Sequence, residues 1–279
     1  MMAQRIWFIT GISSGLGKAL ADEVIARGDY VIGSFRNKDQ AESFDRQFQG
    51  RASACIMDVR DHAGIERCVR EIEGKFGRID VLVNNAGYGI LGAVEEVSIP
   101  EARAIMETNF FGPLKIIQEI LPMMRSRKQG YMVQVSSASG IKATPGFGLY
   151  NASKFALEGL SEALAAELMP LGIRLMIVEP GPFRTEFAGH SILSSPTPIP
   201  DYDSTAGNFK RIMAARHGKQ EGDPSKAAKA IFECLFSEHP PLRLVLGKSA
   251  IDNVKSKIEL MQRDLKDWES VGLATSFTT

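Results

Sequence analysis

Tyr150, Lys154 and Ser137 are the residues of this chain whose types and spacing indicate acid–base chemistry. Tyr150 and Lys154 are four residues apart in a stretch with a helical pattern, so their side chains share one helix face. A phenol has an unperturbed pKa of about 10, and a nearby ammonium group lowers that pKa by favouring the phenolate. Such a tyrosine can protonate a carbonyl oxygen during reduction or deprotonate an alcohol during oxidation.

Ser137 is expected at the end of a buried strand, where its hydroxyl can hydrogen-bond the substrate oxygen. Lys154 is also expected to donate to the ribose hydroxyls of a bound dinucleotide. Taken alone, a Tyr-x-x-x-Lys pair is frequent on helices. Its combination with Ser137 and with a glycine-rich turn near the N-terminus makes coincidence improbable and predicts hydride transfer at a carbonyl carbon.

The glycine-rich turn follows the first predicted strand and opens the first predicted helix. Its glycines permit a tight turn and a close approach to a pyrophosphate, while the helix N-terminus offers free N–H groups. The alternative is a loop that merely connects strand and helix, and the spacing differs from the G-x-G-x-x-G fingerprint. The residues predicted to hold the cofactor here are Gly11, Ser13, Ser14, Gly15, Leu16 and Gly17.

Arg36 at the end of the second predicted strand indicates which dinucleotide binds. An acidic residue at this position would accept from the ribose hydroxyls, whereas an arginine pairs with a 2′-phosphate. The sequence has Arg36 and no acid there, which predicts NADP(H) in preference to NAD(H), with Ser34 or Asn37 assisting. The alternative is a solvated charge at a strand end. Asp58, after the third strand, is predicted to accept from the adenine amino group or else to serve as a turn residue or helix cap.

Asn109 lies in a predicted helix, 101–125, that contains Pro113. Because proline has no N–H, the Asn109 carbonyl loses its regular helical partner and must find another donor. We therefore predict a water at this carbonyl that relays protons between Lys154 and solvent. A proline kink with a solvated backbone is the alternative.

Composition excludes several classes of function. Lysine plus arginine equals aspartate plus glutamate, at 33 each, so no basic excess indicates nucleic acid or an anionic membrane surface. The histidines show no metal-ligand spacing, and no apolar segment is long enough to span a bilayer. Three scattered cysteines fit a reducing compartment better than a disulfide scaffold. With no signal peptide at the start, the prediction is a cytoplasmic protein without a metal.

Short apolar runs alternate with amphipathic segments along the chain. Such alternation predicts an α/β fold in which a doubly wound parallel sheet is covered by helices. The predicted strands are Ile6–Thr10, Tyr30–Phe35, Ala52–Met57, Val81–Asn84, Tyr131–Ser136, Arg174–Glu179 and Leu242–Leu246.

Two segments interrupt the alternation. Residues 186–220 are rich in serine and proline at first, contain a predicted short helix at 209–216, and are interpreted as a lid over the substrate. Residues 249–270 have the pattern of one amphipathic helix. We expect a single domain over residues 1–248 and a C-terminal helical extension, residues 249–279, packed on that domain.

This set of motifs resembles the short-chain dehydrogenase/reductase family over about residues 4–246, and within it the branch of hydroxysteroid and retinol dehydrogenases. The motifs are the glycine-rich turn, Asp58-Val59, Asn84-Asn85-Ala86-Gly87, Asn109, Ser137, Tyr150-x-x-x-Lys154, and Pro180-Gly181 with Thr185. The resemblance implies a seven-stranded Rossmann-type sheet and a catalytic tetrad of Asn109, Ser137, Tyr150 and Lys154. It also implies that Asn84, Asn85, Ala86 and Gly87 border the adenosine half of the cofactor, while Pro180, Gly181, Phe183 and Thr185 line the nicotinamide.

The side chains free to face a substrate are largely apolar, which favours a hydrophobic carbonyl compound or alcohol over a sugar. They are Tyr88, Leu91, Ala143, Phe147, Leu149, Phe183, Phe187 and Tyr202, with Arg184 and Lys142 as candidates for binding a substrate carboxylate. Small residues after the catalytic pair favour a homodimer or homotetramer. Two alternatives are a catalytically silent dinucleotide-binding regulator and an epimerase or dehydratase.

Overall fold

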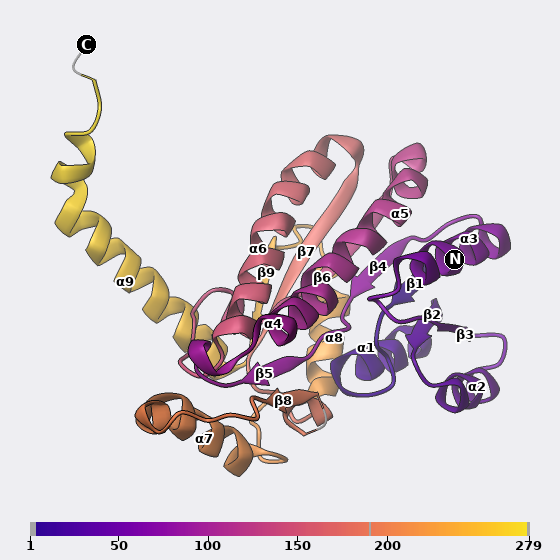
Figure 1. The fold of residues 1–279 in the computed structure, drawn as a ribbon. Coiled ribbons are helices and arrows are strands. Elements are labelled where there is room, and N and C mark those ends of the chain that lie inside the picture. Colours follow the sequence, from indigo (N-terminus) through magenta and orange to yellow (C-terminus); the bar gives the residue numbers. More distant parts are fainter. Residues whose placement is uncertain (1–3, 190, 278–279) are drawn as a thin grey trace.

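The computed structural model describes residues 4–189 and 191–277. Within them, seven strands form one parallel sheet in the order β3-β2-β1-β4-β6-β7-β9 (Figure 1). The predicted doubly wound α/β fold is confirmed, and every predicted strand overlaps an observed one. The strands are β1 (Ile6–Ile9), β2 (Tyr30–Phe35), β3 (Ala52–Ile56), β4 (Val81–Asn84), β6 (Gly130–Val135), β7 (Ile173–Pro180) and β9 (Arg243–Leu246).

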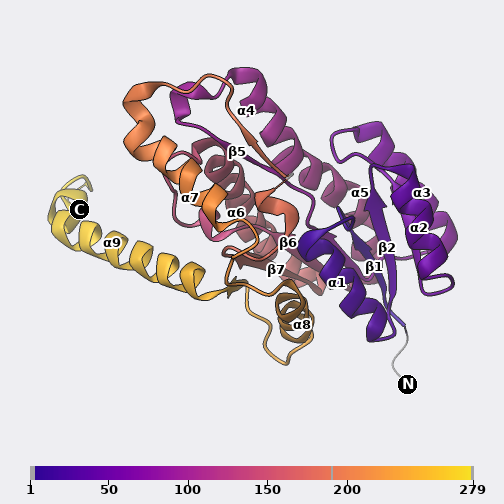
Figure 2. The same ribbon diagram turned by 90° about the horizontal axis from the view of Figure 1, so that it is seen from below.

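Helices cover both faces of this sheet (Figure 2). On one face, a core of Ile, Leu, Val and Met side chains joins the strands to α3 (His62–Phe76), α5 (Gly112–Arg127) and α6 (Gly148–Leu168). On the other face, a second core joins them to α1 (Gly15–Ala26), α2 (Lys38–Gln47) and α8 (Pro224–Leu235). Burial on both faces explains why the strands are continuously apolar rather than alternating.

The order of the strands determines where a ligand can bind. β1 lies between β2 and β4, so the chain leaves β1 toward one edge of the sheet and later continues from β4 toward the other. The loops that follow β1 and β4 therefore diverge at their carboxyl ends and leave a crevice between them. The glycine-rich turn follows β1 and Asn85-Ala86-Gly87 follows β4, so both motifs border this crevice.

The predicted helix 101–125 is interrupted in the structure. α4 (Ile99–Met106) and α5 are joined by a π-helical turn, Glu107–Phe111, in which the Gly112 N–H donates to the Glu107 carbonyl five residues back. Pro113, which has no N–H, lies two residues after the end of this turn. The wider turn contains Asn109, which is fully buried.

The segment 186–220 is tied to the domain by a small parallel sheet that the sequence did not predict. β5 (Gly89–Leu91) pairs with β8 (Ile192–Ser194), each only three residues long and therefore too short for a clear period. Ser195 continues the link by donating its backbone N–H to Leu91 at 2.8 Å. The predicted short helix is confirmed as α7 (Asn208–Arg216).

The C-terminal helix α9 (Lys248–Leu273) corrects the expected packing of the extension. Over residues 248–273, Ala250 is the buried residue, and the helix contacts the domain at its first turns before it projects away from it (Figure 1). The amphipathic pattern therefore predicted the helix correctly. The expectation that the helix packs on the domain was wrong for most of the length of α9.

A disulfide joins Cys55 in β3 to Cys68 in α3, with their Cα atoms 6.6 Å apart. This bond was not anticipated from the sequence, where the cysteines favoured a reducing compartment over a disulfide scaffold, because spacing along the chain does not reveal that α3 packs back against the edge strand. Cys234 carries no disulfide among the described residues.

Gly112 supplies a test of how tightly α5 packs against the loop after β3. A Cβ at this position would approach the Val59 carbonyl oxygen to 2.6 Å, so Gly112→Ala is expected to lower the free energy of unfolding by about 1–3 kcal/mol. Gly74→Ala in α3 is the matched control, since nothing lies within 4 Å of its added Cβ. That substitution should raise stability by about 0.5–1 kcal/mol. Urea unfolding measures both, and equal effects would contradict the packing.

Candidate active site

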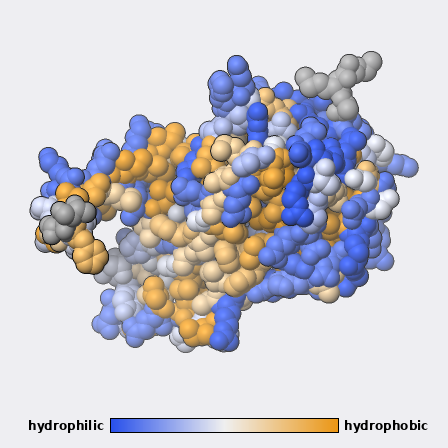
Figure 3. Space-filling model, turned by 90° about the horizontal axis from the view of Figure 1, so that it is seen from above, coloured by the Kyte–Doolittle hydropathy of each residue, from blue (hydrophilic) through white to orange (hydrophobic). Residues whose placement is uncertain are grey.

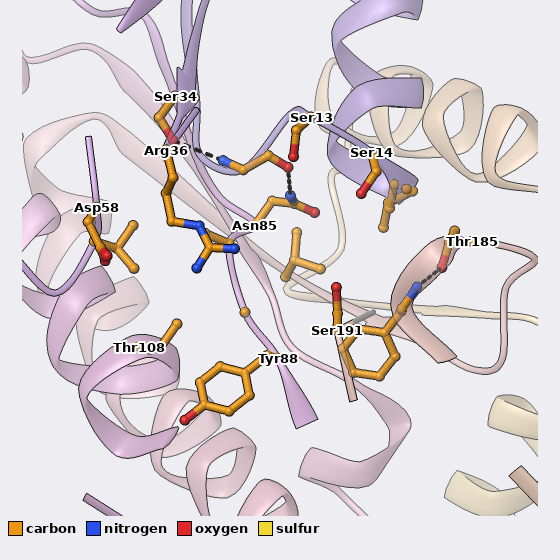
Figure 4. A pocket seen from close by; sticks show the side chains of 18 of the residues that line it. Ser13, Ser14, Ser34, Arg36, Asp58, Asn85, Tyr88, Thr108, Thr185 and Ser191 are labelled. Carbon is orange, nitrogen blue, oxygen red and sulfur yellow. Dashed lines mark hydrogen bonds between the residues drawn. The ribbon is translucent and has the colours of Figure 1, made fainter. Parts of the chain in front are cut away.

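A cavity of about 510 Å³ lies over the carboxyl ends of the central strands (Figure 4). It runs from Arg36 and Asp58 at one end, past the glycine-rich turn, to Tyr150 and Lys154 at the other. Of the residues predicted for the cofactor, those that line it are Gly11, Ser13, Ser14, Gly15, Leu16, Arg36, Asp58, Val59, Asn85, Ala86, Gly87, Tyr150, Lys154, Pro180 and Thr185. The glycine-rich turn, Asp58 and the Tyr150–Lys154 pair therefore border one cavity.

The glycine-rich turn opens the N-terminus of α1 toward this cavity. Gly11 and Gly15 have φ angles of +68° and +64°, which side-chain-bearing residues rarely adopt. Ser14, the N-cap, makes no side-chain cap, so the first N–H groups of α1 stay available to an anion. Asn85 braces the turn by donating its amide to the Thr10 and Gly11 carbonyls at 2.9 and 3.0 Å. The arrangement fits a pyrophosphate.

At the end of the cavity opposite Tyr150 and Lys154, two arginines flank Asp58. Arg60 binds the Asp58 carboxylate through two of its nitrogens, and this pairing holds the pKa of that carboxyl below its usual range. Arg36 points into the same space (Figure 4) and makes no hydrogen bond or ion pair within the described residues. Arg36 is therefore a cation left available to a ligand. Arg60 was not predicted from the sequence, although its position two residues after Asp58 could have indicated an ion pair with that carboxylate.

Two polar residues expected to assist Arg36 have other partners. The Ser34 hydroxyl accepts from the Gly11 N–H at 2.9 Å and so supports the glycine-rich turn. The Asn37 side chain caps α2 by accepting from the Gln40 N–H at 3.0 Å. Both residues hold the backbone around Arg36 in place.

Tyr150 and Lys154 are both buried at the inner end of the cavity. The Tyr150 ring stacks on Phe147 with centroids 4.3 Å apart, and burial raises the pKa of the phenol to about 12, against the opposing effect of the Ser137 hydroxyl. Burial lowers the pKa of the Lys154 ammonium to about 8. The expectation of an acidic phenol was therefore wrong for this state, because desolvation of the phenolate raises its pKa and only the hydrogen bond with Ser137 opposes that rise.

Lys154 is held against the sheet by its own hydrogen bond. Its ammonium donates to the Val135 carbonyl at the end of β6 at 2.8 Å. It lies close to Gly87, where an added Cβ would stand 3.6 Å from the ammonium and 3.1 Å from the Asn109 carboxamide oxygen. The structure thus brings the loop after β4, the π-helical turn and α6 to one point.

The Asn109 side chain makes hydrogen bonds that join two segments of the site. Its carboxamide oxygen accepts from the Tyr88 N–H at 3.1 Å, and its amide donates to the Tyr88 carbonyl at 2.9 Å and to the Ser153 hydroxyl at 3.0 Å. Asn109 therefore clamps the loop after β4 onto α6. The water at its backbone carbonyl stays a prediction.

Several residues predicted for the site lie outside the cavity. Ser137 and Asn84 are buried beside it, Gly17 and Gly181 are packing positions against Asn85 and Ala250, and Phe183 packs on Gly222. Leu91 and Phe147 belong to a small core cluster with Tyr150. Tyr202 donates to Glu95, Lys142 to Ser256 and Arg184 to the Gln220 carbonyl. Residues of the lining that sequence reasoning missed include Met57, Ala104, Thr108, Ser191 and Leu193.

Within residues 4–189 and 191–277, no cluster of three or more His, Cys, Asp or Glu side chains could hold a metal ion. His190 lies outside the described residues. No helix of the described chain has the length and apolar character needed to cross a bilayer.

Comparison with known proteins identifies the family. The short chain dehydrogenase family model matches residues 5–193. A short-chain dehydrogenase structure from Streptomyces avermitilis superposes with a TM-score of 0.93 at 39% identity, covering 99% of this chain and 100% of that one. The NADPH-dependent 3-dehydrocapnine reductase of Ornithobacterium rhinotracheale is 36% identical, covering 87% and 88%. Bos taurus retinol dehydrogenase 8 is 35% identical, covering 86% and 81%. This chain belongs to the short-chain dehydrogenase family and is an oxidoreductase.

Behind Lys154, two buried carboxylates share one guanidinium. Glu158, one turn after Lys154 on α6, and Glu179 on β7 each lie 3.2 Å from Arg243 on β9. Burial and the neighbouring Glu158 charge raise the pKa of Glu179 from its ordinary value of 4.5 to about 7. Folding therefore favours the protonated acid at Glu179.

This shift makes stability depend on pH. Because the folded-state pKa is raised, the Glu179 contribution is complete below about pH 4.5 and is lost as the pH rises through about 7. Glu179→Gln has no carboxyl group at this position and so does not lose stability in this way. The unfolding free energy of the variant minus that of the wild type should therefore increase by about 1–3 kcal/mol from pH 5 to pH 8. Urea unfolding across that range measures it. Glu162→Gln, whose exposed carboxylate pairs with the same Arg243, is the control and should give a constant difference.

Proposed function

We propose that this chain transfers a hydride between NADP(H) and a hydrophobic carbonyl compound or secondary alcohol, with Tyr150 as general acid and base. The observation that carries the proposal is the buried Tyr150 phenol at the inner end of a cavity shaped for a dinucleotide, with Lys154 one turn away on the same helix. A bound nicotinamide would supply or accept the hydride. The roles of the chain's own residues follow from their positions.

Proton transfer is assigned to the Tyr150 hydroxyl. With its pKa raised to about 12, the phenol holds its proton at neutral pH and can therefore donate it to a carbonyl oxygen. Ser137 would hydrogen-bond that oxygen, Lys154 would orient the ribose, and Asn109 would hold the Tyr88 loop and α6 together. Lys154 would then replace the proton lost by Tyr150, and a water at the Asn109 carbonyl would return a proton to Lys154.

NADP(H) is the proposed cofactor in preference to NAD(H). Its pyrophosphate would lie on the N-terminus of α1, and the 2′-phosphate would meet the Arg36 guanidinium. Asp58 would receive the adenine amino group, and Thr185 with Pro180 would border the nicotinamide. The relative from Ornithobacterium rhinotracheale is named as NADPH-dependent, which supports this assignment.

An apolar substrate fits the remaining lining beside Tyr150. The Phe187 ring lies 5.8 Å from the Tyr150 ring and comes from the segment 186–220, which we propose as the lid. Tyr88, Leu193 and Ala104 line the same cavity. A relative named as a retinol dehydrogenase acts on an apolar alcohol, in keeping with such a lining. A catalytically silent regulator would bind NADPH without turnover, and an epimerase or dehydratase would leave NADPH unconsumed, so net NADPH oxidation distinguishes the proposal from both.

We further propose that residues 1–248 form the catalytic domain and that the protein is a cytoplasmic homodimer or homotetramer. The exposed Ala163 and Ala166 on α6 support a close helix–helix contact. The Cys55–Cys68 disulfide does not support a reducing compartment. Thiol labelling of the protein in a cytoplasmic extract tests the proposed location, because it measures whether these two cysteines are reduced there.

Tyr150→Phe removes the proposed acid while keeping the ring that stacks on Phe147. Turnover of an apolar ketone should fall roughly 10²- to 10⁴-fold, since this is the contribution of a positioned general acid. NADPH oxidation followed by absorbance measures turnover, and fluorescence titration should show unchanged NADPH binding. Tyr202→Phe, which removes a hydroxyl bonded to Glu95, is the control. Full activity in Tyr150→Phe would refute the assignment.

Arg36→Ala tests the cofactor preference. Losing a charge-assisted contact of about 1.5–3 kcal/mol should weaken NADPH binding roughly 10- to 100-fold and leave NADH binding nearly unchanged. Calorimetric titration with both cofactors measures this difference. Arg46→Ala, an exposed arginine on α2, is the matched control. Tighter NADH than NADPH binding in the wild type would contradict the role of Arg36.

A further inference from the structure

The projecting helix α9 carries an apolar stripe that is exposed over most of its length. Figure 3 shows hydrophobic side chains gathered along this projection, at the left of the view. The helix has 26 residues and is therefore about 39 Å long. Helices in proteins gain most of their stability from packing an apolar face, so a helix exposed on this scale implies a partner.

The stripe follows a heptad pattern. Its members alternate by three and four residues, which is the spacing of the a and d positions that face a partner helix in a coiled coil. They are Ile251, Val254, Ile258, Met261, Leu265 and Trp268, defined here as the α9 seam. Met261, Leu265 and Trp268 are 58%, 71% and 68% exposed.

The attachment of α9 to the domain leaves the seam exposed except at Val254, which is half-buried. Ser249 donates its backbone N–H to the Glu221 carboxylate at 2.9 Å, and Ser256 accepts from Lys142 at 3.1 Å. Both serines are off the seam, at the heptad position farthest from it, so the domain holds the helix by another side. Ile251 and Ile258 at the seam stay 40% and 49% exposed even near this attachment.

We propose that the α9 seam pairs antiparallel with the α9 seam of a second copy of this chain. In a two-fold antiparallel pair centred between Ile258 and Met261, every a position meets a d position of the other copy. Ile251 then faces Trp268, Val254 faces Leu265, and Ile258 faces Met261 of that copy. All six seam residues acquire apolar partners in this single register.

The flanking charges select this orientation. Antiparallel pairing brings Lys257 opposite Asp264 of the second copy, and Lys248 opposite Glu269, each twice by symmetry. Parallel pairing would instead bring Asp264 beside Glu269 of the other helix, where two like charges repel. The antiparallel pair is therefore electrostatically self-complementary.

A membrane surface is a less suitable partner for the α9 seam than a second helix. α9 contains five basic and five acidic side chains, so it has no net attraction to anionic lipid headgroups. The inference depends on α9 alone and holds whatever substrate the catalytic domain accepts.

Light scattering coupled to gel filtration of the full chain tests the pairing. Ile258→Glu combined with Met261→Glu places charges at the two-fold centre and should halve the wild-type mass. Leu260→Glu is the matched control, because this exposed apolar residue is off the seam and its mass should equal that of the wild type. A wild-type monomer, or a seam variant that keeps the wild-type mass, would overturn the proposal.

A charge exchange tests the register. Lys257→Glu and Asp264→Lys should each raise the dissociation constant of the assembly about 10-fold or more. The double variant should restore it, because the two exchanged side chains would again carry opposite charges where they meet across the pair. These positions are seven residues apart in one helix, so no contact within a chain explains rescue. Absence of rescue, or a monomeric protein that floats with neutral phosphatidylcholine vesicles, would contradict an antiparallel pair.

Discussion

The burial of Lys154 against the end of β6 is the constraint on which the rest of the site depends. An ammonium group loses its hydration inside a protein, so it needs a fixed acceptor, and the Val135 carbonyl provides one at 2.8 Å. That bond links α6 to the central sheet and determines where Tyr150, one turn earlier, meets the cavity. The same desolvation lowers the pKa of Lys154 to about 8 and raises that of Tyr150 to about 12, so both groups favour their neutral forms more than they would in water.

Other buried polar groups extend this arrangement outward. Asn109 joins Tyr88 to Ser153, and Ser153 in turn donates to the Tyr150 carbonyl at 2.8 Å. Asn85 and Ser34 brace the glycine-rich turn in the same manner. These residues need not touch a substrate to matter, because each fixes a loop that would otherwise be free to move. A preorganised site of this kind loses little entropy when a ligand binds.

Most of the fold followed from local pattern, since strands buried on both faces are continuously apolar and helices are amphipathic. Local pattern failed where the deciding contact was distant or short. The π-helical turn around Asn109, the three-residue strands β5 and β8 and the Cys55–Cys68 disulfide each depend on neighbours remote in sequence. Phe147 and Leu91, which were predicted to face a substrate, are buried in a small core cluster with Tyr150.

The sequence alone determined the doubly wound sheet, the glycine-rich turn after the first strand and the Tyr150–Lys154 pair, because all three follow from residue type and spacing within a short segment. Tertiary structure decided how those groups behave. It showed that the phenol is less acidic than its free form, that Asn109 acts through its carboxamide, and that α9 leaves the domain with its seam uncovered. The physical reason is that burial, and therefore desolvation and partner choice, is a property of the packed chain and not of any segment within it.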